Sequence, residues 1–502
     1  MTALTAYRAR LDGLLAELAA EHGPPGAVCG VLAGDEIEVV PWGVANIATG
    51  APVIPTTLFQ LGTITKAYTA TLVMQAVNAG VISLDESVRA QLQEFTVADP
   101  AATIEITPRH LLTHTSGIEG DHLIDTGWNA DALARYVVTL AGLGQIHPTD
   151  EAYSFCNTGY AVAGRLLEVA TGEHFDRVLR RRLARPLGCR ATLTLPQHAL
   201  LHSVAVGHVQ ARGGPATRQS RWALTRSNGP MGGVMAPAGE LLAFARMHVS
   251  GGRGADGVDL LAPAAVDAMQ RPHTDTPVPG EAQAVGWTVS HWGDLTCLGL
   301  DADTFGQRAM LRVVPERRFA ICVMVNSPTG APLAEQLIDR VAADLLDVAP
   351  GTGPAGAATG GRATGRPGNG GADRGAAAEQ ADLGRLAGTY DRLHQRITVS
   401  VPGDDGRAGE SGSDSDGRAG GDGGAGRRVR LVTEPSGVLQ ALGVGHAELD
   451  LEVIEGVGSG GRVVCAGEDP VSGQRVMAVF TPPVDAQPAG LYLGGRLHRR
   501  TG

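Results

Sequence analysis

The stretch from Leu58 to Ala70 constrains the fold of this chain more than any other. Gly62 ends an extended segment, and an apolar run that reaches Val77 follows it. The pattern predicts a helix that begins near Thr63. Positions i and i+3 of a helix share a face, so the Thr63 hydroxyl and the Lys66 amine are expected to point into one space. The first turn of such a helix also presents free backbone N–H groups and the positive dipole end, which suit a developing oxyanion.

Lys66 is the only lysine of the chain, although lysine and arginine together number 41. Arginine cannot release its proton in a protein, whereas a lysine in a desolvated pocket can serve as a base. A lysine kept at this one position therefore indicates a chemical role. The structural alternative is a buried lysine that only binds nearby acceptors.

Two motifs carry a resemblance to a known family. Thr63-Ile64-Thr65-Lys66 resembles the Ser-x-x-Lys motif of the penicillin-recognising serine hydrolases, the β-lactamase-related family, with threonine in the place of the serine. Leu111–Gly117 resembles the Leu-Leu-Thr-His-Thr-Ser-Gly signature of the same family. The resemblance implies that this stretch is mainly structural, so His114 and the preceding His110 are interpreted as scaffold. The resemblance covers about residues 5–347. It implies an α/β (α+β) fold with an antiparallel sheet, a helical subdomain and a site in the cleft between them.

The resemblance also implies roles for individual residues. The nucleophile position falls on Thr63, the general base on Lys66, and the Tyr-x-Asn motif on Phe155-Cys156-Asn157. The late-strand Lys/His-x-Gly motif falls on 300–302. The catalytic candidates are thus Thr63, Lys66 and Asn157, and the residues assigned to the substrate cleft are Phe155, Leu300, Ala302 and Asp303. Leu300 and Ala302 are expected to share the face toward the cleft, with Asp301 pointing away.

Each departure from the family pattern weakens the expected chemistry. The extra methyl of Thr63 restricts χ1 and crowds the attack on a carbonyl. Phe155 lacks the phenolic proton relay, a step of the kind worth about 10²–10⁴-fold in rate. Leu300 cannot bind a substrate carboxylate, and Ala302 places a Cβ where close backbone approach is wanted. Tyr153 lies two residues too early to replace the relay, and His291-Trp292-Gly293 falls on a predicted turn.

Hydrophobic patterning and turn residues predict the elements of the body. Residues 3–22 form a helix, and 26–46 form a hairpin with its turn at Gly34-Asp35. A short helix lies within 107–117, and a helical region runs to about Gly188. The remaining predicted elements are helices at 236–250, 263–270 and 331–347, and strands near 284–291, 295–300, 308–314 and 319–326.

The C-terminal part has a different composition. Residues 348–383 are rich in Gly, Ala and Thr and are predicted to be a flexible linker after the 1–347 domain. Residues 384–502 contain short strand-like runs with glycine turns and resemble a lipocalin-like small β-barrel, interrupted near 403–427 by a predicted disordered insert. Its role, as binding pocket or as lid, is left open, with a lid or substrate-shaping role favoured.

Charge and composition exclude several partners. A formal charge of −11 argues against nucleic acid and against an anionic membrane surface. The N-terminal residues lack a signal-peptide core, and no apolar run approaches the ~20 residues of a membrane span. The six cysteines have no metal-binding spacing and indicate a reducing compartment. The expectation is a soluble, cytoplasmic protein with no metal and no organic cofactor.

Two hypotheses for function follow. In the first, the chain is an acyl-transfer enzyme. Its layout is most similar to penicillin-binding-protein-type thioesterases, which release and cyclise nonribosomal peptides, and its substrate is then a small-molecule or peptide (thio)ester, which a carrier protein could present. In the second, it is a catalytically inactive paralogue that binds a peptide or protein partner through the inherited cleft. Fold alone does not decide between them.

Overall fold

A computed structural model describes residues 3–210, 214–220, 222, 224–348, 383, 385–393, 395–401, 428–436, 446–455, 462–470, 475–481, 483–484 and 487–501. The chain divides into two compact units at Gly361/Arg362, with the short segment Pro470–Gln474 grouped with the first. This division falls inside the predicted linker 348–383. Residues 349–382 of that linker and the predicted insert near 403–427 lie outside the described residues.

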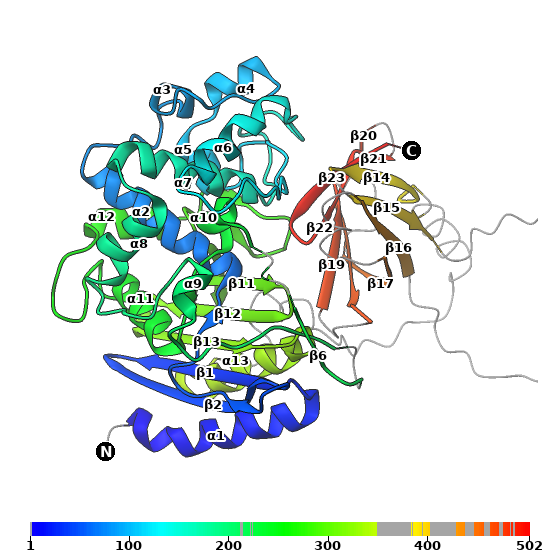
Figure 1. Ribbon diagram of the computed structural model, residues 1–502. Helices are drawn as coiled ribbons and strands as arrows, with labels where there is room; N and C mark the ends of the chain where they lie inside the picture. Colours follow the sequence, from blue (N-terminus) through cyan, green and yellow to red (C-terminus); the bar gives the residue numbers. More distant parts are fainter. Residues whose placement is uncertain are drawn as a thin grey trace, which may run out of the picture. The chain divides into compact units, whose positions relative to one another are not determined.

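A nine-stranded sheet, antiparallel throughout, forms the centre of the first unit (Figure 1). Its strands, from edge to edge, are β3 (Ala51–Pro52), β2 (Glu36–Asn46), β1 (Gly26–Ala33), β13 (Phe319–Val325), β12 (Gln307–Val314), β11 (Leu295–Thr304), β10 (Thr288–Trp292), β9 (Ala282–Gln283) and β8 (Thr274–Asp275). The predicted hairpin is confirmed as β1 and β2, and Gly34 turns between them with φ +63°. The three strands predicted from 295 onward are confirmed as β11, β12 and β13.

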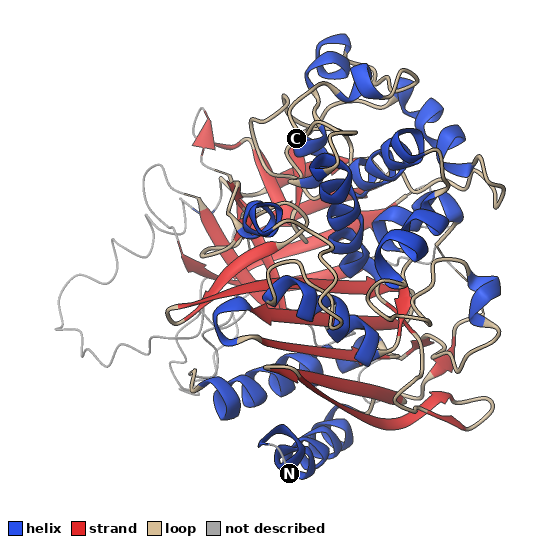
Figure 2. Ribbon diagram, turned by 90° about the vertical axis from the view of Figure 1, so that its left-hand side faces the viewer, coloured by secondary structure: helices blue, strands red, loops and turns tan. Residues whose placement is uncertain are grey.

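Helices cover both faces of this sheet (Figure 2). The α-helices are α1 (Ala3–His22), α2 (Thr65–Asn78), α3 (Val88–Gln91), α4 (Pro100–Glu105), α5 (Pro108–Leu112), α6 (Ala132–Val138), α7 (Asn157–Thr171), α8 (Phe175–Leu179), α9 (Pro196–Ala199), α10 (Gly229–Gly232), α11 (Ala238–Val249), α12 (Pro263–Gln270) and α13 (Ala331–Leu346). Shorter helical turns are η1 (Gly62–Ile64), η2 (Thr139–Gly142), η3 (Arg180–Ala184), η4 (Arg226–Asn228), η5 (Pro315–Arg317) and η6 (Pro328–Gly330). The predicted helices at 3–22, 236–250, 263–270 and 331–347 correspond to α1, α11, α12 and α13.

Strand β13 shows why the sheet is sandwiched. Its sequence, Phe-Ala-Ile-Cys-Val-Met-Val, is apolar at every position, and every residue is buried. Successive side chains of a strand point to opposite faces. Ile321 and Val323 accordingly pack with α1 and α13, whereas Cys322 and Met324 pack in the core that contains α2 and α11. The continuous apolar run is therefore typical of a strand covered on both sides.

The predicted strand near 284–291 is wrong in its first half. The chain turns at 284–287, where the Ala284 N–H donates to the Trp287 carbonyl at 2.7 Å and Gly286 adopts φ +83°. A Cβ on Gly286 would lie 2.4 Å from the Ala70 Cβ. The turn therefore needs glycine both for its backbone conformation and for its close approach to α2. Residues 282–283 and 288–292 become two paired strands, β9 and β10.

The second unit contains a closed eight-stranded barrel, which confirms the predicted small β-barrel. Its strands, in order, are β14 (Gly388–Arg392), β15 (Gln395–Ser400), β16 (Arg428–Pro435), β17 (Ala447–Glu455), β18 (Val463–Glu468), β19 (Arg475–Phe480), β22 (Gly490–Leu493) and β23 (Arg496–Arg500). Buried side chains such as Tyr390, Leu431 and Phe480 form one apolar cluster of the barrel.

Three further two-stranded pairs are β4 (Phe59–Gln60) with β7 (Met235–Ala236), β5 (His208–Val209) with β6 (Thr217–Arg218), and β20 (Pro483–Val484) with β21 (Gln487–Pro488).

Within the described parts of the chain, no helix is both long and apolar enough to cross a membrane.

The turn before α2 makes a close contact between the helical layer and the sheet. Gly62 has φ +45°, and a Cβ there would lie 2.7 Å from the Thr304 methyl and 3.0 Å from the Ala302 Cβ. We expect Gly62→Ala to cost about 2–4 kcal/mol of unfolding free energy, because backbone strain and overpacking against β11 add. Chemical denaturation of the full chain measures the loss.

Gly80→Ala is the matched control, since Gly80 also has a positive φ, +69°, but open space around its missing Cβ. We expect this variant to lose only about 1 kcal/mol, from backbone strain alone. Equal losses in the two variants would show that the β11 contact does not constrain the turn.

Candidate active site

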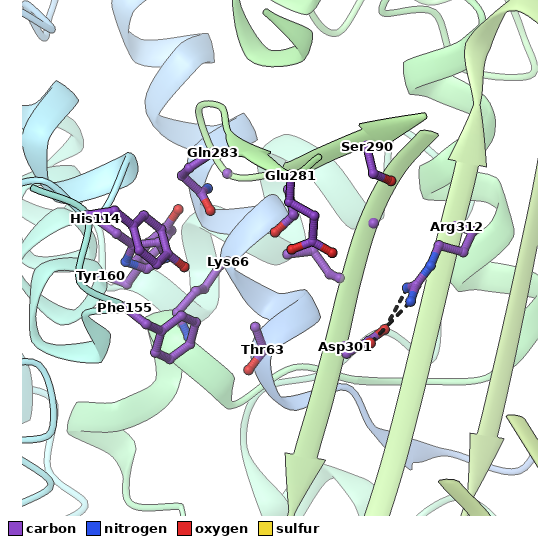
Figure 3. Close-up of a pocket in the computed structure, with 15 residues that line it drawn as sticks. Thr63, Lys66, His114, Phe155, Tyr160, Glu281, Gln283, Ser290, Asp301 and Arg312 are labelled. Atoms are coloured by element: carbon purple, nitrogen blue, oxygen red, sulfur yellow. Dashed lines mark hydrogen bonds and ion pairs between the residues drawn. The ribbon is translucent and has the colours of Figure 1, made fainter. Parts of the chain in front are cut away.

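A pocket of about 190 Å³ opens where the helical layer meets strands β9 to β12 (Figure 3). It brings together residues that lie far apart in the sequence of the first unit. The pocket is lined by Thr63, Lys66, His114, Tyr153, Phe155, Tyr160, Glu281, Gln283, Gly286, Thr288, Ser290, Gly299, Leu300, Asp301 and Arg312. Figure 3 shows the aromatic side chains on one side of Thr63 and Lys66, and Asp301 with Arg312 on the other.

Thr63 lies on the short 3₁₀ turn η1, which directly precedes the start of α2 at Thr65. Backbone pairing of the preceding residues with β7 holds this turn, and the Leu61 N–H donates to the Val234 carbonyl at 2.8 Å. The Thr65 hydroxyl accepts a hydrogen bond from the Val234 N–H at 3.0 Å. The chain on both sides of Thr63 is thus fixed, and its half-buried side chain borders the pocket.

Lys66 is 1% exposed, so its amine is held by protein groups rather than by bulk water. Its Nζ donates to the Asn157 Oδ1 at 2.6 Å and to the Met231 carbonyl at 3.1 Å. The same nitrogen lies 4.5 Å from the centre of the Phe155 ring, within cation–π range. The structure therefore brings Lys66 and Asn157 together, and places Lys66 in one pocket with Thr63.

The orientation of the Asn157 amide follows from a second partner. Its Nδ2 donates to the buried Asp121 carboxylate at 2.9 Å, so its Oδ1 must face Lys66. Asn157 is the first residue of α7, after Cys156, whose Sγ accepts from the Gly159 N–H. The segment around Gly120 crosses closely here, since a Cβ on Gly120 would lie 2.5 Å from the Phe155 carbonyl oxygen. Asp121 is a positioning residue that motif reasoning missed.

The other wall of the pocket is aromatic. The buried His114 has φ +62°, and its Nδ1 accepts a hydrogen bond from the Cys156 N–H at 2.9 Å. Its ring lies 4.8 Å from the Phe155 ring and 5.7 Å from the Tyr153 ring. His114 therefore supports the segment before α7 that carries the Tyr-x-Asn position, as the scaffold interpretation holds, and it also lines the pocket. The Tyr160 hydroxyl donates to the Leu112 carbonyl at 2.7 Å.

Strand β11 keeps the predicted alternation of faces, but the pocket lining differs from the prediction at three positions. Leu300 and Ala302 do share the inner face, but only Leu300 lines the pocket, since Ala302 packs against the Gly62 turn. Asp301, expected to point away, also lines the pocket. Asp303, assigned to the cleft, is outside the pocket lining and forms an ion pair with Arg308 at 2.8 Å.

Both faces of β11 reach the pocket because this part of the strand is a free edge. The β10 ladder ends at the Thr288–Gly299 pair, whereas β11 continues to Thr304 along β12. Among the described strands, none pairs with β11 beyond Gly299 on the β10 side. An extended acyl chain could add to such an edge through backbone hydrogen bonds.

An ion pair borders the far side of the pocket. Arg312 donates from Nη1 and Nη2 to the two oxygens of Asp301 at 2.5 and 3.1 Å. Burial by itself would raise the pKa of Asp301, but the charge and hydrogen bonds of Arg312 outweigh it and hold that pKa below its usual range. Burial raises the pKa of Glu281 to about 7; the charge of Arg312 lowers it and that of Asp301 raises it.

Glu281, Gln283, Ser290 and Arg312 are pocket residues that sequence reasoning missed. They belong to no motif, and only the sheet topology brings them beside Thr63. The one sequence signal of an altered charge in this part of the pocket was Asp301, an acid within the segment assigned to the Lys/His-x-Gly motif. No cluster of three or more His, Cys, Asp or Glu suited to a metal ion occurs among the residues with described positions.

Comparisons with known proteins agree with this geometry. The family model described as "Beta-lactamase" matches residues 11–346, about two thirds of the chain. The chain belongs to the β-lactamase family. Penicillin-binding protein 4 of Amycolatopsis lactamdurans is 37% identical to it over 336 residues, 66% of this chain and 88% of that protein.

Solved structures extend the similarity to the second unit of this β-lactamase-family protein. The crystal structure of SurE with D-Leu is 26% identical, with a TM-score of 0.69, and the match covers 99% of this chain and 100% of that one. The class C β-lactamase from Rhodobacter sphaeroides has a TM-score of 0.54 at 21% identity, over 66% of this chain and 99% of that one, which shows the shared fold of the first unit.

The Lys66–Asn157 hydrogen bond should couple the two residues energetically. We expect Asn157→Leu to cost about 1–3 kcal/mol, because it leaves a buried amine short of an acceptor. In the double variant with Lys66→Met, the combined loss should be smaller than the sum of the single losses by about 1–2 kcal/mol. Denaturation of the four proteins measures this coupling. Replacing the exposed Asn78 with Leu instead should give additive losses with Lys66→Met, and additivity at Asn157 would contradict the assigned bond.

The raised pKa of Glu281 predicts a pH-dependent stability. The folded state holds this proton up to pH about 7, whereas the unfolded chain loses it near 4.5, so stability should fall as the pH rises between these values. The expected loss is about 2–3 kcal/mol. Glu281→Gln, which does not titrate, should become the more stable protein above pH 7.

Denaturation from pH 4.5 to 8.5 measures this difference. Glu105→Gln removes an exposed carboxylate of α4 and should follow the wild-type profile. Parallel profiles for Glu281→Gln and wild type would show that Glu281 is not desolvated.

Proposed function

We propose that this protein binds peptidyl esters or thioesters in its pocket and transfers the acyl group through Thr63, in the release or cyclisation of a nonribosomal peptide, with a weakened nucleophile site. A carrier protein is one way in which the substrate is presented. The observation that carries the proposal is the buried Lys66 amine, held by Asn157 in the pocket that Thr63 borders. This is the pair that a hydroxyl nucleophile needs: a nearby amine and a group that orients it.

The free edge of β11 supports the substrate class. It lies against η1, the turn that carries Thr63, because Ala302 and Thr304 contact Gly62. A peptide that paired with this edge would pass its carbonyl beside the Thr63 hydroxyl. Related proteins include a D-aminopeptidase of Gluconobacter oxydans, 25% identical over 210 residues, and SurE, whose solved structure holds D-Leu, so the names of relatives support a substrate with D-residues.

The altered positions limit the rate of this reaction. Where the family has a phenol, the Phe155 ring packs on the Lys66 amine and supplies no proton. Leu300 supplies no charge to a substrate carboxylate, and Arg312 is already engaged by Asp301. Weak turnover of simple esters and β-lactams follows.

A mass measurement tests the proposal. Incubation of the full chain with an acyl N-acetylcysteamine thioester, or with a fluorophosphonate, should add the mass of one acyl or phosphonyl group, and Thr63→Ala should abolish the addition. Peptide mapping should place the group on Thr63. Wild type without any mass gain would favour the second function, a non-catalytic binder that uses the same pocket.

Restoring the nucleophile alone should not restore ordinary activity. We expect Thr63→Ser to remain within about tenfold of wild type on a chromogenic ester, because groups that act as a unit are not rescued singly. Thr63→Ser with Phe155→Tyr and Leu300→His should show a measurable acylation burst, since Lys66, Asn157 and the surrounding packing stay intact. Wild-type turnover equal to that of an ordinary family member would contradict the weakened-site interpretation.

A further inference from the structure

The pocket carries an acid, Glu281, that has no close ion-pair partner among the described residues. Glu281 precedes β9 and lines the same pocket as Thr63 and Lys66 (Figure 3). Among the described residues, no ion pair joins Glu281 to an arginine, a lysine or a histidine within 4.0 Å, although Arg312 lines the same pocket. The position does not require an acid for packing, because the backbone N–H and carbonyl of Glu281 make the local turn contacts with Val278 and Thr276.

The nearest cations of the pocket are occupied. Both terminal nitrogens of Arg312 donate to Asp301, and Nη1 also donates to the Leu311 carbonyl. The side chain of Arg312 lies over Gly299, where a Cβ would be 3.3 Å from its Cδ, so its position is set by the strand beneath it. Lys66 donates to Asn157 and to Met231. The Asp301–Arg312 pair is neutral as a unit, and Glu281 is the remaining charge on this side.

The surroundings of this acid suit a small cation. Leu300 adds an apolar side chain to the pocket lining, and Gln283 and Ser290 add polar ones, whose Nε2 and Oγ donate to the Ala284 and Cys297 carbonyls. An ammonium group is the ligand that such a carboxylate binds best, and a substrate carboxylate would meet two acids instead. The family pattern has a basic residue at this position of the late strand. Here the same part of the pocket favours a positively charged ligand over a negatively charged one.

We propose that Glu281 binds the primary amine that accepts the acyl group and takes a proton from it. This inference rests on the proposed acyl transfer at Thr63. The bound ammonium gives one proton to the Glu281 carboxylate, and the resulting amine attacks the carbonyl carbon of the Thr63 ester. The C–N bond forms and the C–Oγ bond breaks. A second proton passes from the nitrogen through Lys66 to the Thr63 oxygen, and the third stays on the product amide.

The electrostatics of the pocket fit this transfer. The charges of Arg312 from β12 and Asp301 from β11 act on Glu281, and a hydrogen bond from the Thr276 side chain lowers its pKa. Lys66 from α2 and His114 line the same pocket. Burial raises the pKa of Glu281 to about 7, close to that of an α-amino group. A proton acceptor matched to the operating pH is effective in general base catalysis. Glu281 therefore supplies the proton transfer that Phe155 cannot.

A binding measurement tests the amine site without requiring turnover. The full chain with Thr63→Ala is titrated with alaninamide and with its N-acetyl derivative, by NMR or calorimetry at pH 7. We expect the amine to bind, Glu281→Gln to weaken it at least tenfold, and Glu281→Asp to recover part of the loss. The uncharged N-acetyl derivative should bind both proteins alike, and Glu105→Gln should change nothing. Unchanged amine binding in Glu281→Gln, or none in the parent, overturns the proposal.

A second measurement separates this inference from the proposed function. Wild type and Glu281→Gln are acylated with the thioester probe, and release is followed with and without alaninamide. The inference expects aminolysis of the acylated protein to fall at least tenfold relative to its hydrolysis in Glu281→Gln, whatever the rate at which each protein is acylated. An unchanged ratio of aminolysis to hydrolysis overturns the role of Glu281 while the proposed function stands. Failure of Thr63 to acylate in either protein overturns the proposed function, and with it the transfer step, and the titration then decides the amine site alone.

Discussion

The buried amine of Lys66 is the interaction on which the helical half of the first unit depends. A charged group taken out of water is costly unless hydrogen-bonding partners replace its hydration. Three segments far apart in the chain supply those partners: α2 carries Lys66, α7 begins with Asn157, and α10 provides the Met231 carbonyl. Asp121 fixes the Asn157 amide from behind. These contacts require the packing of α2, α7 and α10 that also forms the pocket.

The contacts of Lys66 are needed by the fold whether or not the residue takes part in a reaction. Removing one partner of a buried polar pair is destabilising even where no reaction uses the pair. Lys66 is therefore held by the fold itself, and its presence as the single lysine is not by itself proof of catalysis. Thr63, Phe155 and Leu300 contribute side chains to the pocket lining, so substitutions at these positions change the surface that a substrate meets.

Local patterns predicted the helices and most strands, because a one-sided or fully apolar run determines them without knowledge of the partner. Motif spacing likewise placed Thr63, Lys66 and Asn157 near one another. The turn at 284–287 was not predictable, since Gly286 is needed for an approach to Ala70 that only the folded chain contains. Glu281 and Arg312 reach the pocket through sheet order, a long-range property. Asp301 alternates with Leu300 as predicted, but the pocket extends around the free edge of β11 to both faces, which strand alternation alone does not show.

Gly299, Asp301 and Arg312 form one structural unit, in which the Arg312 side chain crosses Gly299 to pair with Asp301. An aspartate at position 301 with no cation beside it would be an isolated acid at the rim of a pocket, and burial would raise its pKa. Arg312 stands opposite Gly299 in the β11–β12 register, and its side chain must cross that residue to reach Asp301. A Cβ at position 299 would approach the guanidinium carbon to 3.5 Å, so glycine allows the crossing. The late strand thus presents a neutral cross-strand ion pair at the border of the pocket, and a ligand there meets that pair rather than a free cation.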